Sequence, residues 1–243
     1  MRKGSIVALL GIGLVASAVA TAVALIPTWL PVDASVEAGR IDFTFWFIIA
    51  ICIALFAVVT AAMIYSIWKC RVAPDELEDG PSVHGHTGLE IVWTAIPFVL
   101  VTAIAIVCGI VLSRNQAAGA NPLVINVTAR QYAWSFSYPD ANNVTSPVLF
   151  LPANRSVELY MRSLDVIHAF FVPEFRENMD IVPGMVTQLH ITPNRIGTYR
   201  LQCNELCGAG HTLMNTQVVV ESPAAFAHWL AVQKSQPTTG GKG

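Results

Sequence analysis

Two long apolar runs constrain the fold of this chain more than any other feature. They extend from Phe43 to Trp68 and from Ile91 to Leu112, and each is long enough to cross the ~30 Å hydrocarbon core of a bilayer as a helix. The chain is 54% hydrophobic and only 12% charged, with a mean hydropathy of +0.55, which excludes an ordinary soluble protein. The sequence therefore predicts a membrane α-helical hairpin, with transmembrane helices over residues 43–68 and 89–113.

The charges beside the first helix predict the orientation of this hairpin. Lys69 and Arg71 follow the helix directly, so the loop over residues 69–88 is expected on the cytoplasmic side. An even number of crossings then returns the chain to the outer side. The C-terminal half is therefore expected outside the cytoplasm.

A third apolar run, from Ser5 to Ile26, lies near the start of the chain. Two alternatives remain for residues 1–30. The segment is either a signal peptide, cleaved near Ala18-Val19-Ala20, or an additional transmembrane helix. Both alternatives leave the orientation of the hairpin unchanged.

From Asn121 onward the pattern changes to short segments in which polar and apolar residues alternate, separated by Pro, Gly, Asn and Asp. About eight short strands with such turns are typical of a β-sandwich or barrel. The strands are expected over 122–129, 130–138, 148–151, 156–162, 169–172, 185–191, 197–203 and 216–220. Ser222-Pro223 predicts the start of a helix that runs to about Lys234. The sequence thus predicts an all-β domain over 121–234, followed by a disordered tail over 235–243.

The segment from Cys203 to Met214 concentrates groups that bind soft metals. It contains Cys203, Cys207, His211 and Met214 within twelve residues. Thiolate, imidazole and thioether together favour copper over magnesium, calcium or manganese, and zinc sites do not use methionine. Two thiolates four residues apart can bridge two copper ions, which suits one-electron transfer. A Cys203–Cys207 disulfide is the alternative in an exported domain.

The second imidazole that such a site needs is expected from His168. It begins a predicted strand, and Asp165 lies three residues earlier, where it can accept a hydrogen bond from a metal-bound imidazole. The other candidates are less suitable because they lie at a strand surface, in the cytoplasmic loop or in the last helix: His190, His84, His86 and His228.

Glu90 lies at the cytoplasmic end of the second predicted helix of the hairpin. Its spacing from Thr87 is that of a capping box, and an acidic residue stabilises a helix N-terminus. A role at the entrance of a proton pathway is the functional alternative, because ionisable groups in membrane helices often belong to proton relays.

Several features of composition limit the range of functions. The net charge is −2, which gives no indication of a nucleic-acid partner. From Asn115 onward the chain has eight acidic and eight basic residues, so no strongly acidic docking face is expected. No Cys-x-x-Cys-His motif is present, which excludes a covalently attached c-type haem.

Three motifs carry the metal-binding groups or lie between them: Asp165-Val166-Ile167-His168, Asp180-Ile181-Val182-Pro183-Gly184 and Gln202–Met214. Together they resemble subunit II of cytochrome c oxidase. Two further segments are similar to that family's second membrane helix, Glu90–Pro97, and to its aromatic segment, Gln131–Tyr138. The resemblance extends from about Phe43 to Trp229.

The resemblance implies a membrane hairpin followed by a cupredoxin domain with a dinuclear copper (CuA) centre. It implies side-chain copper ligands at His168, Cys203, Cys207, His211 and Met214. Glu205 would ligate copper through its backbone carbonyl and would share Mg²⁺ with subunit I through its carboxylate. Glu90 would lie at the mouth of a proton pathway into subunit I. Tyr132 stands where the family has its electron-entry Trp, and Trp134 follows two residues later, so either residue is a candidate for electron entry.

The implied function is that of the electron-input subunit of a terminal oxidase. CuA would accept electrons from cytochrome c or a membrane-attached cytochrome and pass them to haem in subunit I, where O₂ is reduced to water with proton pumping. Subunits I and III would be partners in a bacterial inner membrane, with the CuA domain on the extracytoplasmic side. The alternatives are a stand-alone, membrane-tethered cupredoxin for electron transfer or copper handling, and a relative that reduces nitric oxide.

Overall fold

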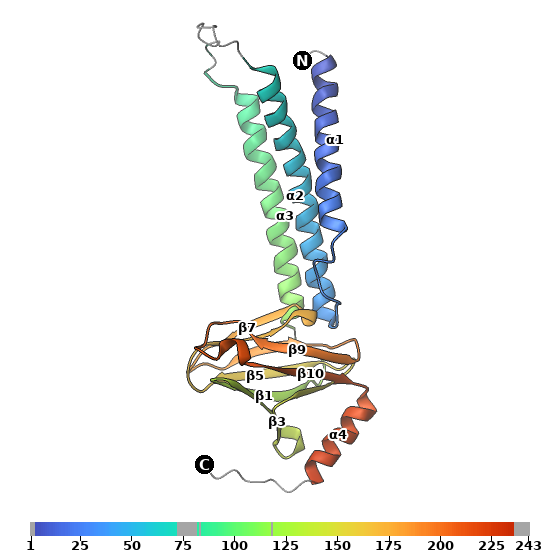
Figure 1. Cartoon of the computed structure of the whole chain (residues 1–243), viewed down its shortest axis with the longest axis vertical. Helices are drawn as coiled ribbons and strands as arrows, with labels where there is room; N and C mark the ends of the chain where they lie inside the picture. The colour runs from blue at the N-terminus through green and yellow to red at the C-terminus, as the bar shows by residue number, and fades with distance from the viewer. Residues whose placement is uncertain (1–2, 72–81, 83, 118, 236–243) are drawn as a thin grey trace. The chain divides into compact units, whose positions relative to one another are not determined.

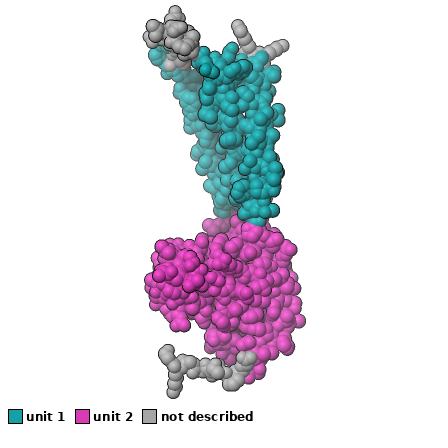
Figure 2. Space-filling model, viewed as in Figure 1, with its two compact units in different colours: residues 1–30, 43–110 teal, residues 31–42, 111–243 magenta. Residues whose placement is uncertain are grey.

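The computed structural model describes residues 3–71, 82, 84–117 and 119–235, and the chain divides into two compact units (Figures 1 and 2). The first unit comprises residues 1–30 and 43–110, and the second comprises residues 31–42 and 111–243. Most of the predicted cytoplasmic loop and nearly all of the predicted tail lie outside the described residues. Each unit is considered by itself.

The first unit is helical, as the apolar runs predict. Its helices are α1 (Lys3–Leu25), α2 (Val36–Lys69) and α3 (Thr87–Asn115), which run roughly parallel in Figure 1. Within the described residues, three helices are long and apolar enough to cross a membrane. Most of their large side chains are exposed, as expected for helices that face lipid or other membrane helices.

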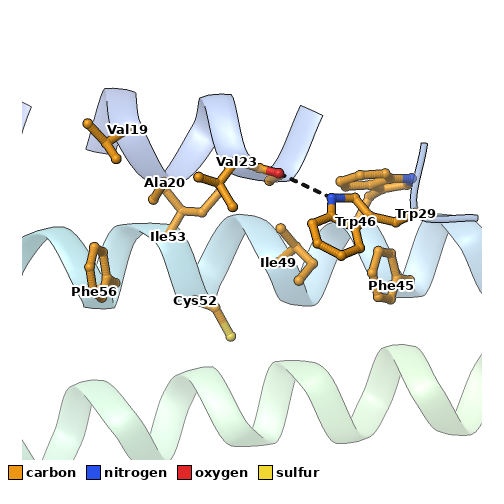
Figure 3. Close-up of a pocket in the computed structure, with 11 residues that line it drawn as sticks. Val19, Ala20, Val23, Trp29, Phe45, Trp46, Ile49, Cys52, Ile53 and Phe56 are labelled. Atoms are coloured by element: carbon orange, nitrogen blue, oxygen red, sulfur yellow. Dashed lines mark hydrogen bonds between the residues drawn. The ribbon is translucent and has the colours of Figure 1, made fainter. Parts of the chain in front are cut away.

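Small residues bring α1 and α2 together. Ala57 and Ala61 are buried, and a Cβ atom added at Gly13 would lie 3.6 Å from the Cβ of Ala61. Such small residues let membrane helices approach closely. Beside this contact lies an apolar groove (Figure 3), and the Trp29 indole N–H donates a hydrogen bond to the Val23 carbonyl, with an N–O distance of 3.1 Å.

α2 begins at Val36, well before the apolar run that starts at Phe43. Ser35 caps this start, because its hydroxyl accepts the Ala38 N–H at 3.0 Å. Residues 31–42 belong to the second unit, where the Glu37 carboxylate accepts the Thr192 N–H at 2.8 Å. The hydrophobic pattern of the sequence cannot reveal this extension over residues 36–42, because the polar residues of the extension pack on a distant part of the chain.

The second unit is built on two five-stranded sheets, in the orders β3-β2-β1-β5-β8 and β4-β10-β9-β6-β7. The strands of the first sheet are β1 (Leu123–Arg130), β2 (Ala133–Tyr138), β3 (Val144–Ser146), β5 (Val157–Ser163) and β8 (Thr187–Ile191). Those of the second are β4 (Leu149–Pro152), β6 (His168–Val172), β7 (Glu177–Ile181), β9 (Gly197–Cys203) and β10 (Asn215–Glu221). The inward side chains of both sheets form one hydrophobic core.

All eight strands that the sequence predicts are present, and β3 and β7 are additional. β3 has only three residues and β7 is polar at three of its five positions, so neither has a strong strand pattern. α4 (Pro223–Ser235) confirms the predicted last helix, and Ser222 caps it by accepting the Ala225 N–H at 3.2 Å. Trp229 of this helix stacks on Phe150, with ring centroids 4.2 Å apart.

The sheet order explains how residues distant in sequence reach one site. β9 pairs with both β6 and β10. Phe170 of β6 lies opposite Cys203 of β9, and Gln202 lies opposite Asn215 of β10. The start of β6, the end of β9 and the loop to β10 therefore meet at one edge of the second sheet.

A half-buried carboxyl group makes the stability of the second unit depend on pH. Burial, together with the nearby Glu37 carboxylate, raises the pKa of Glu177 to about 7. The folded state therefore binds more protons than the unfolded chain between pH ~4.5 and ~7. Because of this difference, stability decreases as the pH rises through that interval and stays low above it.

We expect Glu177→Gln to be more stable than the parent chain at pH 8, by at most about 3 kcal/mol. Near pH 4 the two proteins should be equally stable, because Glu177 is then protonated in both states. Urea unfolding followed by near-ultraviolet circular dichroism measures the difference. Asp180→Asn, at an exposed position of the same strand, is the control, and an equal effect there would contradict the assignment.

Candidate metal centre

The loop between β9 and β10 carries most of the predicted ligands and folds back on itself. The Cys203 N–H donates to the Met214 carbonyl at 3.0 Å, which closes the base of the loop. A short 3₁₀ helix, η3 (His211–Leu213), begins where the His211 N–H donates to the Gly208 carbonyl at 3.0 Å. Gly208 has φ +140, a conformation that residues with a Cβ atom rarely adopt. This glycine therefore lets the loop turn back toward Cys203.

Two unbonded sulfur atoms lie at the centre of the cluster. The Sγ atoms of Cys203 and Cys207 are 3.9 Å apart, and both cysteines are free, whereas a disulfide has an S–S distance of about 2.05 Å. The Nδ1 atom of His168 lies 3.8 Å from the Cys203 sulfur. One donor atom from each of these three buried residues lies within 4.8 Å of the others.

Further donors surround the sulfur pair. On the side of Cys207, His211 Nδ1 is 3.6 Å and Met214 Sδ is 3.8 Å from the sulfur atom. On the side of Cys203, the backbone carbonyl of Glu205 is 3.2 Å from the sulfur atom. The structure thus brings together all six predicted metal residues.

This donor set fits copper. Two thiols, two imidazoles and a thioether are soft or intermediate ligands that copper prefers, and magnesium and calcium do not. Burial and the adjacent Cys203 thiol together raise the pKa of the Cys207 thiol. A raised pKa means that forming the thiolate costs free energy. Because a metal binds the thiolate, a cation between the sulfurs would offset this cost of ionisation.

Asp165 holds His168 in place, as the sequence predicts. Its carboxylate lies 2.8 Å from His168 Nε2 and also accepts the backbone N–H groups of Gln131 and Val166, each at 2.7 Å. Burial raises the pKa of Asp165, but these hydrogen bonds outweigh it and lower the pKa to about 2. The carboxylate is therefore ionised and fixes the ring so that Nδ1 faces Cys203.

Gln131 joins this support to the metal loop, and sequence reasoning did not single it out. Its backbone N–H binds Asp165, and its side-chain amide donates to the Cys207 carbonyl. A glutamine in an aromatic segment carries no spacing signal that would reveal such a role. Gln131 therefore connects Asp165, which holds the predicted ligand His168, to the backbone of the predicted ligand Cys207.

The two aromatic residues predicted for electron entry differ in position. Trp134 is buried, and its ring lies edge-on to those of His168 and Phe170, with centroids 6.4 and 6.2 Å away. Tyr132 is 40% exposed. Its ring packs so closely on the loop that a Cβ atom at Gly210 would come within 2.6 Å of it. Of these two residues, Tyr132 is therefore the one whose ring reaches solvent beside the cluster.

Glu90 lies in the first turn of α3, in the first unit. Its carboxylate accepts the His86 N–H at 3.2 Å, and the His86 ring accepts the Leu89 N–H at 3.1 Å. Glu90 thus takes part in a helix cap, but its partner is His86 and not Thr87. The side chain also lines a shallow apolar groove with Ile91 and Phe98.

The remaining histidines lie outside the cluster. His84 contacts Ser82 at 2.7 Å, and His228 lies in α4. The side chain of His190 is 13% exposed, with Nε2 3.9 Å from the Glu158 carboxylate. His190 is therefore half-buried, whereas the sequence predicts a surface position. Its strand, β8, pairs with β5 at the edge of the first sheet.

Comparison with known proteins agrees with this arrangement. Residues 21–108 match the family model of the transmembrane domain of cytochrome c oxidase subunit II, and residues 145–222 match that of its periplasmic domain. The two models match in the order that the structure shows, helical unit first and β-domain second.

Curated relatives extend the match over most of the chain. Cytochrome c oxidase subunit 2 of Synechocystis sp. is 31% identical over 86% of this chain and 77% of its own length. The same subunit of Thermostichus vulcanus is 32% identical over 82% of this chain and 77% of its own length. The crystal structure of the periplasmic domain of cytochrome oxidase subunit II from Bradyrhizobium japonicum is 27% identical, covering 49% of this chain and 96% of that chain, with a TM-score of 0.46.

The domain matches and the relatives agree with the geometry of the cluster. The chain has membrane-spanning helices, an extracytoplasmic cupredoxin domain and a His–Cys–Cys group suited to copper. It belongs to the family of cytochrome c oxidase subunit II, the electron-input subunits of haem–copper terminal oxidases.

Proposed function

We propose that the cluster holds two copper ions as a CuA centre. The observation that carries this proposal is the pair of buried, unbonded thiols 3.9 Å apart, with an imidazole beside each one. His168, Cys203, Cys207, His211 and Met214 would bind through side chains, and Glu205 through its carbonyl. When bound, the two ions supply a one-electron redox centre whose change in charge is shared between two metals.

The residues of this chain prepare the centre for fast electron transfer. The hydrogen bonds of Asp165 and Gln131 hold ligands from two separate segments in fixed positions. Little has to move when the charge of the centre changes, since the ligands are already positioned. Tyr132, exposed above the metal loop, is the proposed entry residue, with buried Trp134 beneath the surface.

The proposed electron path runs from a cytochrome c, through this centre, to haem in subunit I of the complex, where O₂ is reduced and protons are pumped. Subunits I and III are the proposed partners in a bacterial inner membrane. The Glu205 side chain is exposed beside the cluster, which supports a carboxylate ligand to Mg²⁺ shared with subunit I, because Mg²⁺ prefers such oxygen ligands.

Residues 1–30 are proposed as a retained third membrane helix, supported by the close packing of Gly13 on Ala61.

We expect Cys203→Ser to reduce the copper content from two ions to at most one per chain. The electron paramagnetic resonance spectrum should change from hyperfine coupling to two copper nuclei to coupling to one, because only one bridging sulfur remains. Spectroscopy of the purified complex, and metal analysis from which the copper of subunit I is subtracted, measure both effects. Cys108→Ser, a free cysteine of α3, is the control, and an unchanged spectrum in Cys203→Ser would refute the ligand assignment.

Glu90 is proposed to admit protons, and Glu90→Gln separates this role from helix capping. Glutamine can still accept the His86 N–H but cannot carry a proton, so oxygen turnover should slow several-fold while the copper spectrum stays the same. Glu90→Asp, which retains a carboxylate, should recover part of the turnover. Normal turnover in Glu90→Gln would leave Glu90 as a helix cap only.

Glu205→Gln tests the second proposed metal. The backbone carbonyl beside Cys203 is retained, so copper should still bind. In cells grown with manganese, Mn²⁺ that replaces Mg²⁺ should be lost from the variant complex, as seen by its paramagnetic resonance signal. Retention of bound Mn²⁺ would place the Mg²⁺ site elsewhere.

A further inference from the structure

The two halves of the metal cluster are held in different ways. His168 begins β6 and Cys203 ends β9, and these strands pair with Phe170 opposite Cys203. The Asn204 N–H also donates to the Ala169 carbonyl of β6 at 3.2 Å. This half of the cluster, here called the sheet half, is therefore positioned by regular structure.

Cys207 and His211 form the other half, here called the loop half, and lie beyond the end of β9. Hydrogen bonds within the loop give it its shape, since the His211 N–H donates to the Gly208 carbonyl at 3.0 Å. Such local bonds do not by themselves fix the loop relative to His168. A link to another part of the domain is needed to hold the two halves in a constant relation.

The Gln131 side chain supplies this link. Its amide donates to the Cys207 carbonyl, and its backbone N–H donates to the Asp165 carboxylate at 2.7 Å. The same carboxylate lies 2.8 Å from His168 Nε2. Gln131 thus joins the loop half to the group that orients a ligand of the sheet half.

Gly208 leaves the space in which this contact forms. A Cβ atom at this position would lie only 2.8 Å from Gln131 Nε2, well inside the separation at which nonbonded atoms pack. Gln131 is an exposed residue, so burial in the core does not account for the position of its side chain. The hydrogen bond to the metal loop does.

Equal support for both halves matters when two metal ions share one odd electron. The electron is shared only if the two sites have nearly the same energy, and that energy depends on how the ligands of each site are held. If the loop half moved more freely than the sheet half, the electron would settle on one ion. The ligands would then have to rearrange with every transfer.

We propose that Gln131 is a positioning residue that keeps the loop half equivalent to the sheet half, so that the odd electron is shared by both copper ions. The inference rests on the proposed function, because it requires two ions in the cluster. Gln131 acts through the Cys207 carbonyl and not as a ligand.

Gln131→Met in the purified oxidase complex tests this role, because methionine has a similar length but no donor, and the backbone N–H to Asp165 is retained. The copper content should stay the same. The electron paramagnetic resonance spectrum should change from equal coupling to two copper nuclei to coupling dominated by one. The reduction potential of the centre should shift, and electron transfer from the centre to haem should slow several-fold. An unchanged spectrum would overturn the proposal.

Two further variants separate the lost hydrogen bond from other effects. Gln131→Glu keeps the shape of the side chain but replaces the donor by an ionised carboxylate, so its spectrum should change as that of Gln131→Met does. A change in Gln131→Glu alone would make charge the cause and the proposal wrong. Gln188→Met, at an exposed position of β8, is the matched control, and an equal change there would also count against the proposal.

Hydrogen–deuterium exchange distinguishes positioning from folding. Amides between Cys207 and Leu213 should exchange several-fold faster in Gln131→Met, while those of β6 and β9 stay as protected as in the parent complex. Faster exchange throughout the second unit, or loss of copper, would contradict a positioning role. If the parent complex itself shows no coupling to two copper nuclei, the proposed function fails, so the two failures are distinguishable.

Discussion

The structure of the extracytoplasmic domain depends on keeping two thiols close together, buried and unbonded. Burial and the neighbouring thiol both oppose ionisation of Cys207, so its thiol stays protonated unless a cation is bound. A cation bound beside the sulfurs would favour the thiolate form. The pairing of β9 with β6 and β10, the turn at Gly208 and the fixed ring of His168 all serve to hold donors around that position.

The supports of the metal cluster also shape the surface above it. Asp165 orients His168 and binds the backbone of Gln131, which in turn binds the carbonyl of Cys207. The same turn places the Tyr132 ring on the metal loop. Rigidity at the ligands and rigidity at the proposed electron-entry residue Tyr132 therefore have one source. A change at this turn would affect both.

The sequence predicts those features that depend on local pattern. Apolar length identified the membrane helices and alternation identified eight strands. Residue types at fixed spacing predicted Cys203, Cys207, His211 and Met214 as a metal site, and these residues do lie together. Other features depend on contacts between distant segments and leave no local pattern. They include the start of α2 at Val36, where residues of the β-domain unit supply the partners, and the link from Gln131 to Cys207.

Several acidic residues make contacts inside the second unit. Asp165 is engaged by His168, Glu158 lies beside His190, and Asp42 binds Arg176 at 2.8 Å. Glu177 is half-buried, with a pKa raised to about 7, so its carboxyl group is only about half ionised near neutral pH. Acidic side chains that serve internal contacts cannot also form an outward-facing acidic surface. These residues therefore contribute little to an outward-facing acidic surface, in keeping with the equal numbers of acidic and basic residues from Asn115 onward.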